Sequence, residues 1–293
     1  MLTTEARALL AAGATGVQVG AAIVATRYVI QDIGPMSLAL LRYTIGFLCL
    51  VPFALSASRL RFSWPDFLAV VGLGIMQFAV LVVLLNVGLK FVTSTRAALL
   101  FSTMPLLTMV VASALGRERL TAAKTMGVVL TIVGVAVTLG EKLFSGAGAY
   151  EWLGMLAVLG SALSGAVCSV LYRPYLARYP TLPLGALAML ASVVFLTGLA
   201  GTESFFTDPP PLQAPAWAAV VFIGVSSGVG YMTWLWALKH TSPTRVTVFL
   251  ALSPVTAALL GVGLLGEALT SGIVLGMLCV AGGLWMATRS ASG

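Results

Sequence analysis

The chain has 293 residues, of which 59% are apolar and only 9% carry a formal charge. Soluble globular domains contain about 25% charged residues, so this composition excludes a soluble protein with a polar shell. The net charge is +7 at pH 7. In a soluble protein such a charge would suggest a nucleic-acid partner, but here it is typical of basic loops on one side of a membrane, and we expect none.

Ten apolar stretches follow one another along the chain, each with few or no charges. Each is long enough for a helix to cross a hydrocarbon core of about 30 Å. None alternates polar and apolar residues as the strands of a membrane barrel do. The predicted spans are residues 8–27, 33–56, 67–89, 96–116, 121–140, 152–172, 182–202, 215–238, 245–266 and 268–288. The sequence therefore predicts an all-α integral membrane protein with ten transmembrane helices.

The basic residues are distributed unevenly between the predicted loops. Eleven of the 16 Lys and Arg residues lie on the side of the two termini, four lie on the other side, and Arg42 lies within the second span. Cytoplasmic loops carry the excess of Lys and Arg in membrane proteins. We therefore expect a multi-pass protein of the cell (inner) membrane with both termini in the cytoplasm.

One pattern occurs twice, 149 positions apart. The stretch KFVTSTRAALLFSTMP begins at Lys90, and KHTSPTRVTVFLALSP begins at Lys239; both carry Thr-Arg at the same place and end on Pro. Each copy belongs to a unit of five spans. Because five is odd, the second unit enters the membrane from the opposite side, which is a common architecture of secondary transporters. We predict two inverted five-helix repeats, residues 1–145 and 146–293, around a central cavity.

Two further motifs point to a known family. The signature E-x-L-T-x(5)-G-x(6)-G occurs as ERLTAAKTMGVVLTIVG from Glu118 and as EALTSGIVLGMLCVAGG from Glu267, and the first spans are joined by VATRYVIQDIGPMSLALLRYTIGFL. With these motifs the chain resembles the EamA-type permeases of the drug/metabolite transporter superfamily, and among them the YddG-type exporters of aromatic and other neutral amino acids. The resemblance implies a cavity between spans 1–4 and 6–9, and transport by export. The two halves differ at Arg42, whose counterpart is Leu190.

Polar residues inside the spans are the candidates for a binding site. Gln18 in span 1 and Ser164 in span 6 occupy equivalent positions in the two repeats. Each could line the cavity or form a hydrogen bond between helices, and both interpretations are open.

In span 8, Ser227, Tyr231 and Trp234 share one helix face at positions i, i+4 and i+7. The image of this face in span 3 contains Phe78, with Asn86 beside it. Gln77 lies about 100° from Phe78 on a regular helix, so we expect it to face elsewhere. The aromatic residues of the face could also be packing residues only.

Arg42 is a charge inside a span, and no acidic residue lies in any span core to neutralise it. Such a charge must face the protein interior or water. Its partner could be the carboxylate of a substrate or the carbonyl groups at neighbouring helix ends. Pro105 and Pro254 each remove a backbone hydrogen bond within a span, so we expect them to be hinges or static kinks.

An amide, hydroxyl and aromatic lining with one arginine suits a small zwitterion with an apolar side chain. We expect a secondary transporter that moves small neutral metabolites, amino acids above all, by alternating access. Other carriers of the superfamily, for drugs, metabolites or nucleotide sugars, and a channel-like facilitator are the alternatives. With one His in a loop and no acid in the span cores, we expect no enzyme, cofactor or metal. The predicted partners are a small-molecule substrate and the lipid bilayer, for a monomer or weak homodimer.

Overall fold

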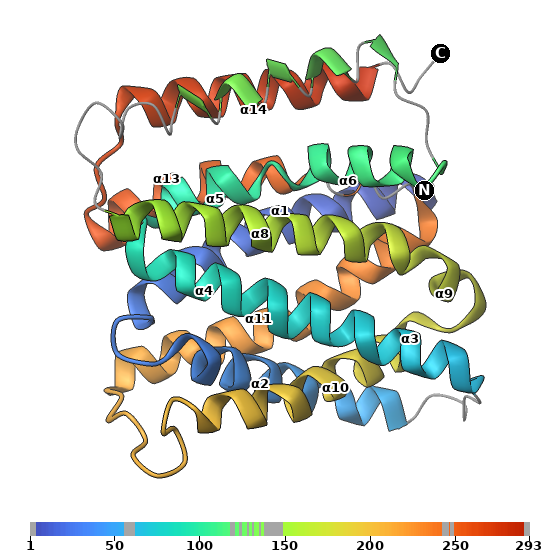
Figure 1. Cartoon of the computed structure of the whole chain (residues 1–293), viewed down its shortest axis with the longest axis vertical. Coiled ribbons are helices and arrows are strands. Elements are labelled where there is room, and N and C mark those ends of the chain that lie inside the picture. The colour runs from blue at the N-terminus through green and yellow to red at the C-terminus, as the bar shows by residue number, and fades with distance from the viewer. Residues whose placement is uncertain are drawn as a thin grey trace.

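The computed structural model describes residues 4–55, 62–117, 149–241 and 249–289, with residues 121–122, 125–127, 129–130, 132–134, 136–137 and 246. Within these residues the regular structure is helical and contains no β-strand (Figure 1). Seven of the helices found there are long and apolar enough to cross a membrane. They are α1 (Thr4–Val29), α2 (Pro35–Leu55), the continuous α3–η1–α4 (Trp64–Gly74, Ile75–Val80, Leu81–Phe91), α5–α6 (Ser94–Phe101, Met104–Ala114), α8–α9 (Ala149–Leu171, Arg173–Arg178), α10 (Thr181–Gly201) and α11 (Ala214–His240). The all-α membrane class is confirmed.

The count of ten spans stays a prediction. Two further apolar helices, α13 (Leu252–Leu265) and α14 (Ser271–Arg289), lie in the ninth and tenth predicted spans, but their apolar stretches are shorter than the other seven. The fifth predicted span is described only in part, and its residues 125–127 and 132–134 are helical.

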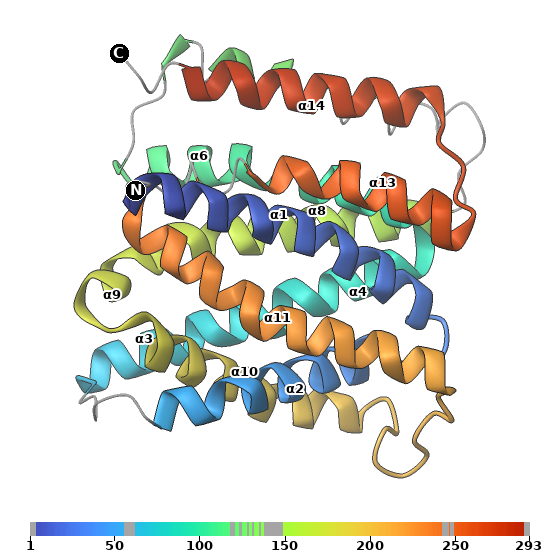
Figure 2. The ribbon, with the colours of Figure 1, turned by 180° about the vertical axis from the view of Figure 1, so that it is seen from behind.

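The helices lie side by side, with their ends gathered on two opposite faces of the bundle (Figures 1 and 2). The start of α1 and the end of α14 are on the right in Figure 1, whereas α2 and α5 start on the left. Helix α4 ends on the left and α11 ends on the right. The third helices of the two predicted repeats therefore run in opposite directions, as inversion requires.

The packing of the helices follows the same symmetry. Helix α1 packs against α11 and α13, and α8 packs against α4 and α6. The first helix of each predicted repeat thus contacts the third and fourth helices of the other. The predicted boundary at residues 145 and 146 lies outside the described residues and stays a prediction.

A π-helix interrupts the third span at η1. There the backbone N–H of Leu81 donates to the carbonyl of Met76, five residues earlier. Helix α8 supports this segment: the Ser161 hydroxyl donates to the Leu81 carbonyl at 2.7 Å, and the Ser164 hydroxyl to the Met76 carbonyl at 3.0 Å. Both serines therefore form hydrogen bonds between helices, and for Ser164 this is one of the two roles that the sequence left open.

Pro105 and Pro254 each follow an interruption of the α-helix. Helix α5 ends at Phe101 and α6 begins at Met104, directly before Pro105. In the second half, the 3₁₀ segment η2 (Phe249–Ala251) precedes α13, which contains Pro254. Because a proline cannot donate to the carbonyl four residues earlier, the chain leaves the α-helix at this point.

Carboxylates of the second half hold helix starts of the first half at one end of the bundle, here called the capped face. Glu203 accepts hydrogen bonds from the Met36 and Ser37 backbone at 3.1 and 2.8 Å, and from the Ser37 hydroxyl at 2.7 Å. A carboxylate is favoured there because a helix N-terminus carries unpaired N–H groups and partial positive charge. The two halves are thus joined at the start of α2.

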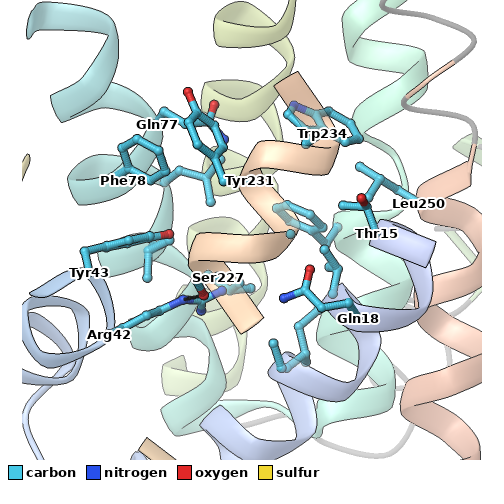
Figure 3. Close-up of a pocket in the computed structure, with 18 of the residues that line it drawn as sticks. Thr15, Gln18, Arg42, Tyr43, Gln77, Phe78, Ser227, Tyr231, Trp234 and Leu250 are labelled. Atoms are coloured by element: carbon cyan, nitrogen blue, oxygen red, sulfur yellow. Dashed lines mark hydrogen bonds between the residues drawn. The ribbon is translucent and has the colours of Figure 1, made fainter. Parts of the chain in front are cut away.

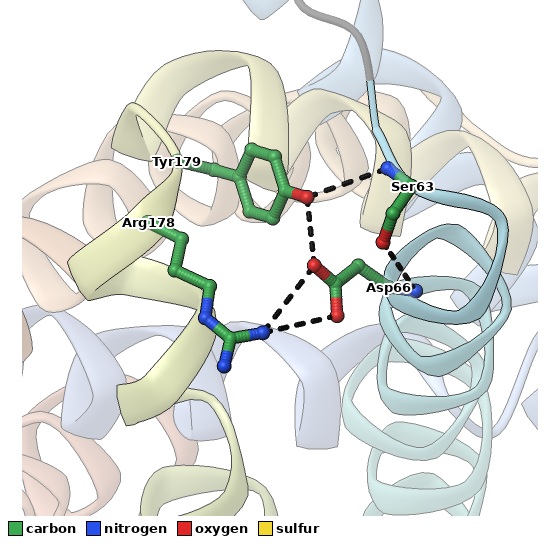
Figure 4. Close-up of polar contacts among 4 residues, drawn as sticks. All are labelled: Ser63, Asp66, Arg178 and Tyr179. Carbon is green, nitrogen blue, oxygen red and sulfur yellow. Dashed lines mark hydrogen bonds and ion pairs between the residues drawn. The ribbon is translucent and has the colours of Figure 1, made fainter.

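The opposite face has a different contact between the halves (Figure 4). The Tyr179 hydroxyl donates to Asp66 at 2.7 Å, and Arg178 pairs with the same carboxylate at 3.4 Å. Ser63 completes the cluster, since its hydroxyl caps α3 at the Asp66 N–H. The turn between α9 and α10 is therefore fixed to the start of α3.

Candidate functional site

A pocket of about 100 Å³ lies in the middle of the bundle, between the two halves (Figure 3). Both halves contribute walls, from α1, α2, α3–η1–α4, α5, α6, α11 and η2. The polar and aromatic lining residues are Thr15, Gln18, Arg42, Tyr43, Gln77, Phe78, Phe101, Ser227, Tyr231 and Trp234. Six of the eight predicted binding residues are among them.

Glycines at the crossing of α2 and α11 bring the first wall together. A Cβ atom on Gly228 would lie 2.8 Å from the carbonyl oxygen of Gly46, and one on Gly224 would lie 2.6 Å from Cβ of Ile45. Small residues of this kind let membrane helices approach closely. The close crossing places Arg42 of α2 beside Ser227 of α11.

Arg42 is held by one of its three nitrogens. Its Nε donates to the Ser227 hydroxyl at 2.7 Å, and that hydroxyl donates in turn to the Ile223 carbonyl at 2.6 Å. The guanidinium carbon also lies 5.5 Å from the centre of the Tyr43 ring. Within the described part of the chain, the two terminal nitrogens have no hydrogen-bond partner and Arg42 forms no ion pair. The charge is therefore oriented but not neutralised.

The opposite wall is formed by α1. The amide nitrogen of Gln18 donates to the Ser226 hydroxyl at 3.2 Å, and the hydroxyls of Thr15 and Thr233 lie 3.0 Å apart. A Cβ atom on Gly230 would overlap the amide of Gln18, so this glycine leaves room for the Gln18 side chain in its present position. Gln18 thus lines the pocket and also joins α1 to α11, which unites the two roles considered for it.

An aromatic wall closes the pocket between these two sides. The Phe78 ring meets the Tyr231 ring edge to face, with centres 4.4 Å apart, and meets the Tyr43 ring at 4.8 Å. Trp234 lies one turn further along α11 and also faces the pocket (Figure 3). The predicted face of Ser227, Tyr231 and Trp234 is therefore a pocket face, opposite Phe78.

Two predicted binding residues lie elsewhere. The Asn86 side chain is fully buried and its amide donates to the Pro35 carbonyl at 2.8 Å, while Ser164 binds the π-helix. Neither lines the pocket. Both act between helices in this structure.

Gln77 corrects one sequence-based expectation. It lines the pocket together with Phe78, although a regular helix would turn it about 100° away. Gln77 lies in the π-helix η1, so the regular helix that this expectation assumed is not present at this point. Tyr43 and Thr15 are further lining residues that the sequence analysis did not select as binding residues. The sequence could have identified both, because Tyr43 is next to Arg42 and Thr15 lies one helical turn before Gln18.

The fold and the pocket together define a multi-pass helical membrane protein with a central pocket between its two halves. The chain belongs to the EamA-like transporter family, which it matches twice, over residues 6–140 and 152–289. The resemblance to EamA-type permeases is thereby confirmed, and the family is one of transporters.

Several relatives cover most of the chain. An uncharacterized transporter of Archaeoglobus fulgidus is 28% identical over 92% of this chain and 94% of its own length. A protein of Streptantibioticus cattleyicolor described as a probable terminal-alkyne amino-acid exporter is 30% identical, over 83% of this chain and 80% of its own length. One solved crystal structure, 23% identical, covers 98% of this chain and 99% of its own with a TM-score of 0.72, which supports the fold alone.

Proposed function

We propose that the protein is a secondary transporter of small metabolites with the size and chemistry of amino acids, aromatic and neutral ones first. The observation that carries this proposal is the pocket itself. It combines one oriented arginine, two side-chain amides and an aromatic wall, and it is built from both halves. A nucleotide sugar fits this site poorly, because its diphosphate would require more than one cation.

Export is the direction that one named relative favours. The Streptantibioticus cattleyicolor protein is named as an exporter of an amino acid, and it is 30% identical to this chain. We propose the same direction here, with both chain ends in the cytoplasm as the distribution of Lys and Arg favours. In this orientation the capped face is the extracellular one.

The mechanism that we propose is alternating access by rocking of the two repeats. The contacts between the halves differ at the two faces, with Glu203 at one and Asp66 at the other. Opening the pocket to one side requires the contact on that side to separate while the other persists. The helix interruptions before Pro105 and Pro254 are the hinges, because Phe101 and Leu250 line the pocket there.

Counterflow in proteoliposomes tests the proposed function. Liposomes that contain the purified protein are loaded with one unlabelled compound, and uptake of the same compound in labelled form is followed. The compounds tested in turn are phenylalanine, leucine, a hexose and a nucleoside. We expect saturable counterflow of phenylalanine and leucine that is absent from empty liposomes. Flux of the hexose or nucleoside alone would contradict the proposed substrate class, and flux without saturation would indicate a channel.

A further inference from the structure

In the part of the chain that the structure describes, the pocket has a cation without a matching anion. Among the described residues Arg42 is the single charged side chain that lines it, and the other polar lining residues there are amides, hydroxyls and an indole. Arginine stays protonated in proteins, and an unpaired charge inside a membrane is costly. The site in its present form therefore favours a ligand that brings one negative charge.

The guanidinium is arranged to receive a carboxylate. Ser227 occupies Nε and has already committed its own proton to the Ile223 carbonyl, so it acts on Arg42 only as an acceptor. This contact fixes the plane of the guanidinium and leaves both terminal nitrogens without a partner in the described residues. Two such nitrogens match the two oxygens of a carboxylate.

A substrate ammonium group would find no counterpart of this kind. The acceptors on the α1 wall are neutral oxygens: the hydroxyl of Thr15, which donates its own proton to the Ala11 carbonyl, and the amide oxygen of Gln18, whose amide nitrogen donates to Ser226. Bringing an ammonium group out of water without an opposite charge costs free energy that hydrogen bonds to neutral groups only partly recover. The pocket thus distinguishes the two charged groups of an amino acid.

We propose that the group recognised by this site is the carboxylate, and that the substrate class includes aromatic and apolar monocarboxylates that lack an ammonium group. This inference rests on the proposed transport function and specifies its substrate. The carboxylate binds the two free nitrogens of Arg42, and the apolar body lies against Phe78 and Tyr231. Ser227 is a positioning residue, since it acts through Arg42.

Three compounds with the same ring and the same two-carbon chain distinguish the contributions of the two charged groups to binding. Phenylalanine carries both groups, 3-phenylpropionate only the carboxylate, and phenethylamine only the ammonium group. Their dissociation constants are measured by calorimetry on the full-length protein in lipid nanodiscs, which avoids the passive permeation of weak acids. We expect 3-phenylpropionate to bind at least as tightly as phenylalanine, and phenethylamine not to bind. Arg42→Gln should raise the dissociation constant of 3-phenylpropionate roughly tenfold or more, since a charge-assisted pair is lost. Arg42→Lys should give an intermediate value.

The control variant is Arg7→Gln, which removes an exposed arginine in the first turn of α1 and should leave binding unchanged. Ser227→Ala should weaken the binding of 3-phenylpropionate and leave the order of affinities of the three compounds the same. Tighter binding of phenylalanine than of 3-phenylpropionate would overturn the inference, as would no binding of the acid or binding that Arg42→Gln leaves unaltered. Failure of the proposed function would be recognised separately, as no counterflow of any compound in proteoliposomes.

Discussion

Glu267, in the link between α13 and α14, caps α5 at Ser94. Its Oε1 accepts the Ser94 backbone N–H at 2.7 Å and its Oε2 accepts the Ser94 hydroxyl at 2.7 Å. The same Oε2 receives the backbone N–H and the hydroxyl of Thr95 at 3.2 and 3.0 Å. Two further carboxylates of the second half act at the capped face: Glu203 caps the start of α2, and Glu151 pairs with Arg96 at 2.7 Å. Together with Glu267 they hold the first half there.

Replacing Glu267 by Gln should weaken this joint. Gln has nearly the same shape but keeps one acceptor oxygen and loses the charge that favours a helix N-terminus. We expect the free energy of unfolding to fall by about 1–3 kcal/mol, because buried donors lose their partner. Thermal unfolding in detergent measures the change. Asp208→Asn, an exposed acid near the same face, should have no effect, and equal stability of the two variants would contradict the assigned role.

Gly228→Ala should disturb the pocket through the backbone. The added Cβ would meet the carbonyl oxygen of Gly46 at 2.8 Å, so α11 has to move away from α2. The contact between Arg42 and Ser227 then lengthens, and we expect substrate affinity to fall roughly tenfold or more, as for loss of a charge-assisted bond. Gly198→Ala is the matched control: nothing lies within 4 Å of its added Cβ, and a helical Ala should stabilise by about 0.5–1 kcal/mol. Unchanged affinity in Gly228→Ala would exclude this crossing as the element that positions Arg42.

Much of the fold could be predicted from local sequence patterns. The apolar stretches locate the seven long helices, and the match between Lys90 and Lys239 predicts the inverted direction of α4 and α11. The face of Tyr231 and Trp234 follows from regular helix geometry, and α11 is a regular helix throughout. These parts were predictable because each depends on neighbours within a few turns.

The rest depends on contacts that no short stretch contains. The π-helix that contains Gln77 is bound by Ser164 of another helix, so the periodicity of the third span alone could not reveal it. Likewise, the caps by Glu203 and Glu267 join residues more than 160 positions apart. Residues that serve such long-range contacts, Asn86 among them, resemble binding residues in sequence, since both kinds are polar and lie in apolar spans.

Ser164→Ala should affect stability and not binding. The hydroxyl donates to the Met76 carbonyl of the π-helix and does not line the pocket. We expect a loss of about 0.5–1.5 kcal/mol in unfolding free energy, the value of a typical hydrogen bond, with substrate affinity unaltered. Ser169→Ala, whose hydroxyl bonds only to Gly165 in its own helix, should cost less. A loss of affinity in Ser164→Ala that exceeds its loss of stability would make this serine a binding residue after all.

Pro105→Ala and Pro254→Ala test the hinges. In each case alanine restores a backbone N–H, so the interrupted helix can become continuous and stiffer. We expect counterflow to slow by roughly tenfold, which corresponds to about 1.4 kcal/mol added to the barrier, while binding persists. Pro215→Ala is the control, because proline in the first turn of α11 removes an N–H that has no partner in the helix. The rates are normalised to folded protein from size-exclusion profiles. Transport at the original rate in both variants would mean that the interruptions are static, and that the halves move about some other point.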